Sequence, residues 1–131
     1  MSVARRNAKR HGVRSRVRFR RGDLFGPLSD IECRHLDVVV ANLPYLTPAE
    51  TRAVPYEPRL ALVAGPDGLS AFRDFFRQAK RRDVRAPMLL EIDPRRTRAV
   101  VGLARRTFPT ATVRVQKDLA GRNRIVSVGP R

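Results

Sequence analysis

The sequence feature that most constrains the fold is the mostly apolar run Leu36–Ala41, which is followed at once by the tetrapeptide Asn42–Tyr45. Its three consecutive valines predict a strand buried on both faces, and such strands are typical of parallel sheets. In an open parallel sheet, ligands bind at the carboxyl ends of the strands. We therefore expect Asn42 and Tyr45 to lie where a substrate binds.

Length and composition predict one modest core in a chain of 131 residues. The sequence contains neither an apolar run of the roughly 20 residues that cross a bilayer nor a segment resembling a signal peptide, so we expect a soluble, cytoplasmic protein without a membrane partner. The single cysteine, Cys33, cannot form an internal disulfide. With only His11 and His35 beside it, no zinc site is expected.

The formal net charge is +16, from 28 lysines and arginines against 12 acidic residues. One explanation is a nucleic-acid or ribonucleoprotein partner held through phosphates, which includes weak contact with RNA or the ribosome. The other is a compositional bias, because the arginines are scattered along the chain. Both explanations predict association with acidic partners that weakens with salt.

The pattern of apolar residues predicts an α/β fold. We expect a helix over residues 3–11, a short strand over 17–20, an irregular connection over 26–35 and a long substrate loop over 46–68. Phe72, Phe75, Phe76 and Ala79 recur at helical spacing and predict a core-facing stripe.

The second half of the chain predicts another buried strand over residues 88–92, then Asp93 as a helix N-cap and a helix that runs to about Phe108. Two alternating strands follow, over residues 111–116 and 125–128. Because the connector between them has no room for a helix, these strands are expected to pair as an antiparallel hairpin.

The tetrapeptide Asn42–Tyr45 suits chemistry on a planar NH₂ group. The Asn42 side-chain oxygen offers one acceptor, and the Leu43 carbonyl offers a second because Pro44 keeps Leu43 extended. The Tyr45 ring can stack on the flat group. A plain exit from a strand, in which Asn caps, Pro turns and Tyr packs, explains the same four residues.

The tetrapeptide resembles the (Asn/Asp/Ser)-Pro-Pro-(Tyr/Phe) signature of S-adenosylmethionine-dependent amino methyltransferases. Four further segments resemble, in the same order, the protein-(glutamine-N5) methyltransferase family that modifies peptide-chain release factors: Tyr56–Leu62, Gly65–Leu69, Leu90–Ile92 and Asp118–Arg124. The resemblance covers nearly the whole chain.

The resemblance implies roles for individual residues. Asn42 and the Leu43 carbonyl would hold the glutamine amide of a release factor, with Pro44 shaping the turn and Tyr45 stacking on the amide. The amide nitrogen would attack the methyl group of S-adenosylmethionine and displace S-adenosylhomocysteine. Asp23 matches the carboxylate that meets the cofactor's adenine, and Leu24 and Asn42 would contact the cofactor beside it.

The resemblance also implies a Rossmann-like class I sheet ordered 3-2-1-4-5-7-6, of which residues 1–131 would be a single domain truncated at its N-terminus. The first two strands of that sheet would be missing. In the sheet they would lie between the strand over residues 17–20 and the strand over residues 37–41. No G-x-G motif occurs in the sequence, although the family binds its cofactor with a glycine-rich loop. We therefore expect an incomplete cofactor site, and a chain that is inactive by itself.

Two alternatives remain open. Leu43 replaces the first proline of the family signature, and Asn-Leu-Pro-Tyr is the form seen in adenine-N6 methyltransferases that act on ribosomal RNA. An inactive basic remnant that adheres to RNA is the other alternative. Glu91 could face the substrate, but a hydrogen-bonded structural carboxylate is the interpretation that we favour.

Overall fold

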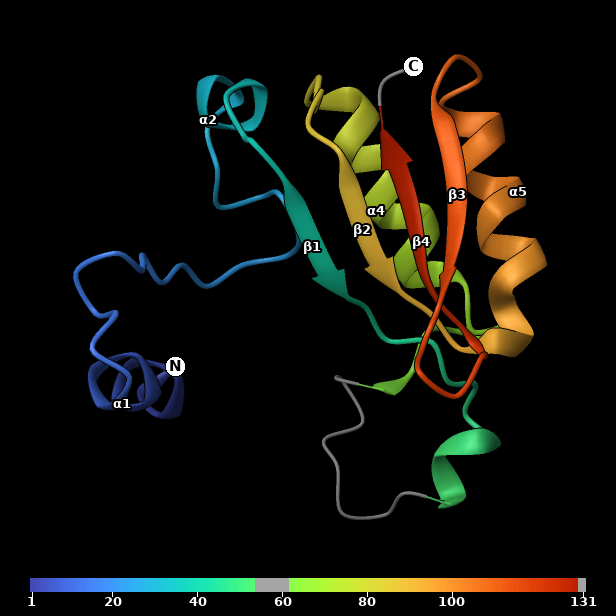
Figure 1. Ribbon diagram of the computed structural model, residues 1–131, viewed down its shortest axis with the longest axis horizontal. Coiled ribbons are helices and arrows are strands. Elements are labelled where there is room, and N and C mark those ends of the chain that lie inside the picture. The colour runs from blue at the N-terminus through green and yellow to red at the C-terminus, as the bar shows by residue number, and fades with distance from the viewer. Residues whose placement is uncertain (54–61, 130–131) are drawn as a thin grey trace.

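A computed structural model describes residues 1–53 and 62–129 of the chain. Its centre is a mixed four-stranded sheet in the order β1-β2-β4-β3. The strands are β1 (Val39–Asn42), β2 (Met88–Glu91), β3 (Thr112–Lys117) and β4 (Asn123–Gly129). Helices α4 (Ser70–Arg81) and α5 (Thr97–Thr107) cover one face of this sheet, as Figure 1 shows.

The pairing of the strands confirms the predicted topology of this half of the fold. β1 runs parallel to β2, with Asn42 opposite Glu91, whereas β4 pairs antiparallel with both β2 and β3. Asp93 caps the short helix η2 (Pro94–Arg96) through a hydrogen bond from the Arg95 N–H. The predicted N-cap at Asp93 is thus confirmed.

The core lies between the sheet and the two covering helices. Phe72, Phe76 and Ala79 of α4 are at most 1% exposed, so the predicted phenylalanine stripe is confirmed as core. Strands β2 and β4 meet it with alternate side chains, among them Leu90 and Val126. Burying each large apolar side chain of this kind stabilises the fold by about 1.5–3 kcal/mol.

The N-terminal region differs from what the pattern predicts. Helix α1 (Ser2–Arg10) forms, but residues 17–20 are not a strand, so that prediction was wrong. Within the described residues no neighbouring strand pairs with this segment. Instead, the guanidinium groups of Arg5 and Arg14 lie 5.6 and 5.8 Å from the centre of the Phe19 ring. Alternation alone therefore did not make a strand here.

Two short helices lie in segments that the sequence analysis treated as irregular. Helix α2 (Asp30–Arg34) falls in the predicted connection over residues 26–35, and η1 (Glu50–Ala53) lies in the long loop that follows Tyr45. Residues 54–61 of that loop lie outside the described residues, and so does most of the Tyr56–Leu62 motif.

The described helices contain no stretch of length and apolarity sufficient to cross a membrane. In the hairpin, Arg124 forms an ion pair with Asp118, with Nη2 3.3 Å from a carboxylate oxygen. Arg122 contributes its backbone N–H to the same carboxylate instead of a side-chain pair.

Candidate functional site

Asn42 is the last residue of β1, and its side chain is exposed at the carboxyl end of the strand. Among the described residues, no hydrogen bond to the Asn42 amide is present. Its neighbour across the parallel pair is Glu91, the last residue of β2. Two polar residues therefore end two adjacent parallel strands at the edge where ligands bind in such sheets.

The residues after Asn42 anchor the exit of the strand. The Leu43 side chain is 7% exposed and belongs to the core, and Tyr45 is half-buried against the same core. Pro44 between them is also half-buried. Because Leu43 and Tyr45 are both held by packing, the backbone that presents the Leu43 carbonyl has little freedom.

The chain beyond Tyr45 is fixed to a second part of the molecule by backbone pairing. Leu46 donates its N–H to Leu62 and accepts from the Ala64 N–H, at 2.9 and 2.8 Å. These bonds form an isolated parallel bridge between Leu46 and Val63. Backbone hydrogen bonds therefore join Leu46, the residue after Tyr45, to residues 62–64.

Glu50 links this loop to the segment after β2. Its carboxylate accepts from the Thr47 N–H at 2.8 Å and lies 2.7 Å from Arg96 Nη2 and 3.0 Å from Arg95 Nη1. The Thr47 hydrogen bond, with the two guanidinium charges, lowers the pKa of Glu50 below its ordinary value. Glu50 thus remains ionised and joins the loops that follow β1 and β2.

Gly68 makes a close approach that only a glycine allows. Its φ is +71°, and a Cβ at this position would overlap the Tyr45 carbonyl oxygen and lie 2.9 Å from Arg96 Nε. The turn around Gly68 also contains Asp67, which accepts from the Leu69 N–H and from Arg73. Its pKa is lowered, mainly by the Arg73 hydrogen bond.

The predicted cofactor residues lie beside the same strand. Leu24 and Asn42 line a common hollow of about 470 Å³ along β1, together with Phe25, Leu28, Leu36, Val38–Leu43 and Phe75. Asp23 is not among its lining residues; its carboxylate accepts from Gln78 Nε2 at 2.8 Å. The structure therefore brings Leu24 and Asn42 together, whereas the Asp23 carboxylate binds Gln78 and does not line the hollow.

These residues fit only part of S-adenosylmethionine. An apolar wall, the Asn42 amide and the nearby Asp23 carboxylate suit a flat base with NH donors. Within residues 1–53 and 62–129, no charged side chain lines the hollow, so none is placed there to hold the ribose or the methionine end. The same residues hold no cluster of metal ligands.

Glu91 was expected to be a structural carboxylate held by hydrogen bonds, and the described residues do not show this. No hydrogen bond or ion pair to its side chain is present among the described residues, although it is half-buried. Asp93, two residues later, is bound by Arg95, and this contact lowers the pKa of Asp93. Within the described part of the chain, Glu91 is thus an unpaired carboxylate beside Asn42.

The site predicted from the sequence did not include Glu50, Arg95, Arg96 or the packing role of Gly68. A signal for Glu50 was present: Thr47 and Glu50 form the pattern Thr-x-x-Glu of a capping box, in which each side chain binds the other's backbone N–H. The partners Arg95 and Arg96 lie more than forty positions away in sequence, and nothing local indicates them.

Comparison with known proteins gives close relatives. The release factor glutamine methyltransferase of Moorella thermoacetica is 38% identical over 131 residues, which cover 95% of this chain and 44% of that protein. The Bacillus anthracis protein of the same name is 36% identical over 96% of this chain and 46% of its own length. The chain is a homologue of the release factor glutamine methyltransferases. No family model matches it.

The resemblance drawn from the motifs is thereby confirmed, and the relatives are enzymes. This chain spans less than half the length of these curated relatives. The ribosomal protein uL3 glutamine methyltransferase of Bradyrhizobium diazoefficiens is also similar, at 40% identity over 83 residues, or 60% of this chain and 25% of that protein. Both names describe methylation of a glutamine in a protein.

Proposed function

We propose that this chain carries the acceptor-binding part of an S-adenosylmethionine-dependent methyltransferase whose substrate is a glutamine side chain of a peptide-chain release factor. The observation that carries the proposal is the exposed Asn42 amide at the carboxyl end of β1, which forms no hydrogen bond to a described residue and has its flanking backbone held by Leu43 and Tyr45. The names of the relatives favour a glutamine over an adenine in RNA.

The proposed role of the tetrapeptide is to hold the acceptor nitrogen. The Asn42 side-chain oxygen and the Leu43 carbonyl would each accept one hydrogen of the substrate NH₂ group. Two such acceptors oppose delocalisation of the nitrogen lone pair into the amide and orient it for attack. Tyr45 would cover the flat amide with its ring. The cofactor, when bound, supplies the methyl group.

We propose further that β1 is an interior strand in the complete enzyme. The strands numbered 1 and 2 in a class I sheet would then extend the sheet beyond β1, and residues 1–131 would form the C-terminal part of one catalytic domain. In support, Val38 and Val40 are 50% and 75% exposed on β1 and the residue before it. The enzyme would act in the cytoplasm, where release factors work.

Methyl transfer tests this proposal. The chain is joined to the segment of the Moorella thermoacetica relative that precedes the matched region, and incorporation of labelled methyl into a release factor is measured. Asn42→Ala is expected to lower kcat by about 10²–10³, the usual effect of removing one positioned polar group at a reacting centre. The control is Asn7→Ala on the exposed face of α1, which is expected to leave the rate unchanged.

Two results contradict the proposal: a rate that is unchanged by Asn42→Ala, or methylation of ribosomal RNA in place of the release factor. A calorimetric titration of the chain alone adds a second check. Because the described residues fit only part of the cofactor, we expect weak binding or none, and micromolar affinity for S-adenosylmethionine would contradict that expectation.

A further inference from the structure

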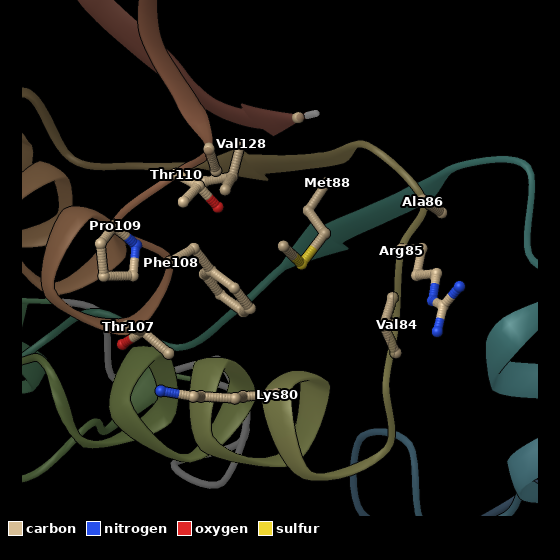
Figure 2. A pocket seen from close by; sticks show the side chains of 12 residues that line it. Lys80, Val84, Arg85, Ala86, Met88, Thr107, Phe108, Pro109, Thr110 and Val128 are labelled. Atoms are coloured by element: carbon tan, nitrogen blue, oxygen red, sulfur yellow. The ribbon is translucent and has the colours of Figure 1, made fainter. Parts of the chain in front are cut away.

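Two adjoining hollows lie along α4 and α5 and beyond their C-terminal ends, and Asn42 lines neither. The first, of about 510 Å³, is lined by Lys80 and Arg85 and by the segment 107–111; the second, of about 480 Å³, lies between the two helices. Lys80 and Thr107 line both hollows, so they form one continuous depression. Figure 2 shows Lys80, Arg85 and Phe108 around the first hollow.

This depression, which we call the basic groove, is lined by six cationic side chains: Arg73, Arg77, Lys80, Arg81, Arg85 and Arg106. Among the described lining residues there is no acidic side chain. Three of the six cations are neutralised from outside the groove, because Arg73, Arg77 and Arg85 pair with Asp67, Asp74 and Asp83.

The other three cations, Lys80, Arg81 and Arg106, have no ion pair within the described residues. All three are exposed. Many other cations of the described chain also lack an ion pair, and these three differ from them in lining the same depression. Concentrated cationic charge in a depression attracts phosphate groups.

The cations on α4 form a row that is long enough to contact several phosphates of one nucleic-acid strand. Arg73, Arg77 and Arg81 recur every four residues along one side of the helix, and they span about 12 Å at 1.5 Å per residue. Arg106 faces them from the last turn of α5. A backbone that carries several phosphates can therefore contact both walls of the groove.

An aromatic ring borders the same groove. Phe108 lines the first hollow and is half-buried, and its ring is supported edge-on by Phe76 at 6.0 Å between centroids. A fixed ring beside a positive groove is the arrangement on which unpaired bases stack in proteins that bind single-stranded nucleic acid. Each hollow also falls in the range of about 300–1,000 Å³ that is typical of ligand sites.

The groove is separate from the candidate methyl-transfer site. Lys80 and Arg81 occupy the last turn of α4, whereas the first turn of α4 follows Gly68, which packs under Tyr45. A ligand in the groove would thus leave Asn42 free for its own substrate.

We propose that the basic groove binds single-stranded RNA, with phosphates on Lys80, Arg81 and Arg106 and a base on Phe108. The hollowed shape and the ring favour a strand with unpaired bases over a flat lipid surface. The proposal does not depend on the methyl-transfer function, because it needs only the residues of the groove. It gives a location to the RNA contact that the net charge suggested.

Fluorescence anisotropy with a labelled 20-nucleotide oligouridine tests it on the chain as it exists. The triple variant Lys80→Gln, Arg81→Gln, Arg106→Gln is expected to bind at least tenfold more weakly. Since each lost phosphate contact lowers the salt slope by about 0.7 for a single strand, the slope should fall by about 2. A matched triple at exposed arginines outside the groove, Arg98→Gln, Arg114→Gln and Arg122→Gln, is the control and should lose less than threefold.

Phe108→Leu gives a second measurement that leaves the net charge unchanged. Because stacking of a base on an aromatic ring is lost, binding should weaken roughly fivefold or more. Circular dichroism is used to check that each variant is folded. If the triple variant unfolds, the three single variants replace it, and each should lose about twofold in RNA affinity.

Equal losses in the groove and control triples would overturn the proposal, because binding would then follow net charge alone. Unchanged affinity in the groove triple, or no binding by the unaltered chain, would overturn it equally. Vesicles of phosphatidylglycerol are tested in parallel. Loss of vesicle binding in the groove triple with RNA affinity intact would assign the surface to lipid and reject RNA.

Discussion

The two edges of the sheet are built differently. At one edge, β1 and the residue before it expose Val40 at 75% and Val38 at 50%. At the other edge, β3 presents Arg114, Gln116 and Lys117, all exposed. Natural sheets protect their free edges with charged side chains, above all lysine, because unpaired backbone groups invite another strand. β3 follows this practice, whereas β1 does not.

This difference supports the proposal that β1 is an interior strand of a larger sheet. Interior parallel strands have continuous apolar sequences because both faces and both edges are covered. The apolar run Leu36–Ala41 has that composition, while the alternation of β3 suits a strand at the end of a sheet. The comparison can be tested by substitutions in the loop connected to each edge strand, in the edge strands themselves, and in the helix before β1.

The largest effect is expected where the loop after β1 meets Gly68. Gly68→Ala places a methyl group against the Tyr45 carbonyl at a φ of +71°. The left-handed conformation and the overlap together should cost about 2–4 kcal/mol of unfolding free energy. The control, Gly121→Ala, has a similar φ of +77° in the hairpin beside β3 but nothing within 4 Å. It should cost only about 1 kcal/mol, as left-handed strain alone does.

Urea unfolding measures both variants. If Gly68→Ala and Gly121→Ala destabilise the chain equally, the β1 loop is not held more tightly than the hairpin, and this part of the comparison fails.

The second prediction exchanges the character of the two edges. The uncharged β1 edge predicts that the chain self-associates through it. Val40→Lys should weaken this self-association at least tenfold, because it gives β1 the charge that β3 already has. It should change the unfolding free energy by less than about 0.5 kcal/mol, since Val40 is 75% exposed. Arg114→Val should have the reverse effect and strengthen self-association through β3. Sedimentation velocity over a range of concentrations checks both, and equal association in all three chains contradicts the prediction.

The smallest effect concerns α2, the helix just before β1. The Arg20 hydrogen bond, together with those from Ser29, lowers the pKa of Glu32 to about 2 from its ordinary 4.5. The folded state thus favours the ionised carboxylate. Its contribution to stability is present above pH 4.5 and is lost as the pH falls toward 2.

Glu32→Gln should therefore reduce the fall in melting temperature between pH 4.5 and 2. Above pH 6 the dependence of the melting temperature on pH should be unchanged. Because the side chains of Arg20 and Glu32 are each 37% exposed, solvent screens the pair and the change should be small. Glu32→Asp keeps a carboxylate and is the control. A fall in Tm of unaltered steepness in Glu32→Gln would show that this carboxylate does not contribute.

Most of the sheet and its covering helices could be predicted from the sequence, because apolar periodicity is strong in residues 36–45 and 70–128. The predicted order of the four strands and the Asp93 cap followed from that pattern and from the resemblance. What was missed has a common signature. Both unpredicted helices, α2 and η1, begin with a capping box: Ser29 with Glu32, and Thr47 with Glu50.

The errors came from contacts that a local pattern does not contain. Residues 17–20 alternate like a strand, yet a strand also needs a partner, and Phe19 packs against guanidinium groups instead. Glu91 was expected to be hydrogen-bonded. In the described part of the chain it has no partner, because Arg95 and Arg96 in the loop after β2 bind Asp93 and Glu50 instead. The roles of Asn42, Leu43, Tyr45, Asp23 and Leu24 stay predictions until the variants are assayed.

The burial of Cys33 has a practical consequence. This single cysteine is 0% exposed and belongs to the core cluster beside β1. A cysteine introduced at Val40 or Arg114 could be labelled with a maleimide dye while the native thiol stays protected, which makes either edge accessible to distance measurements. The rate at which Cys33 itself reacts would then report how often α2 opens away from the core.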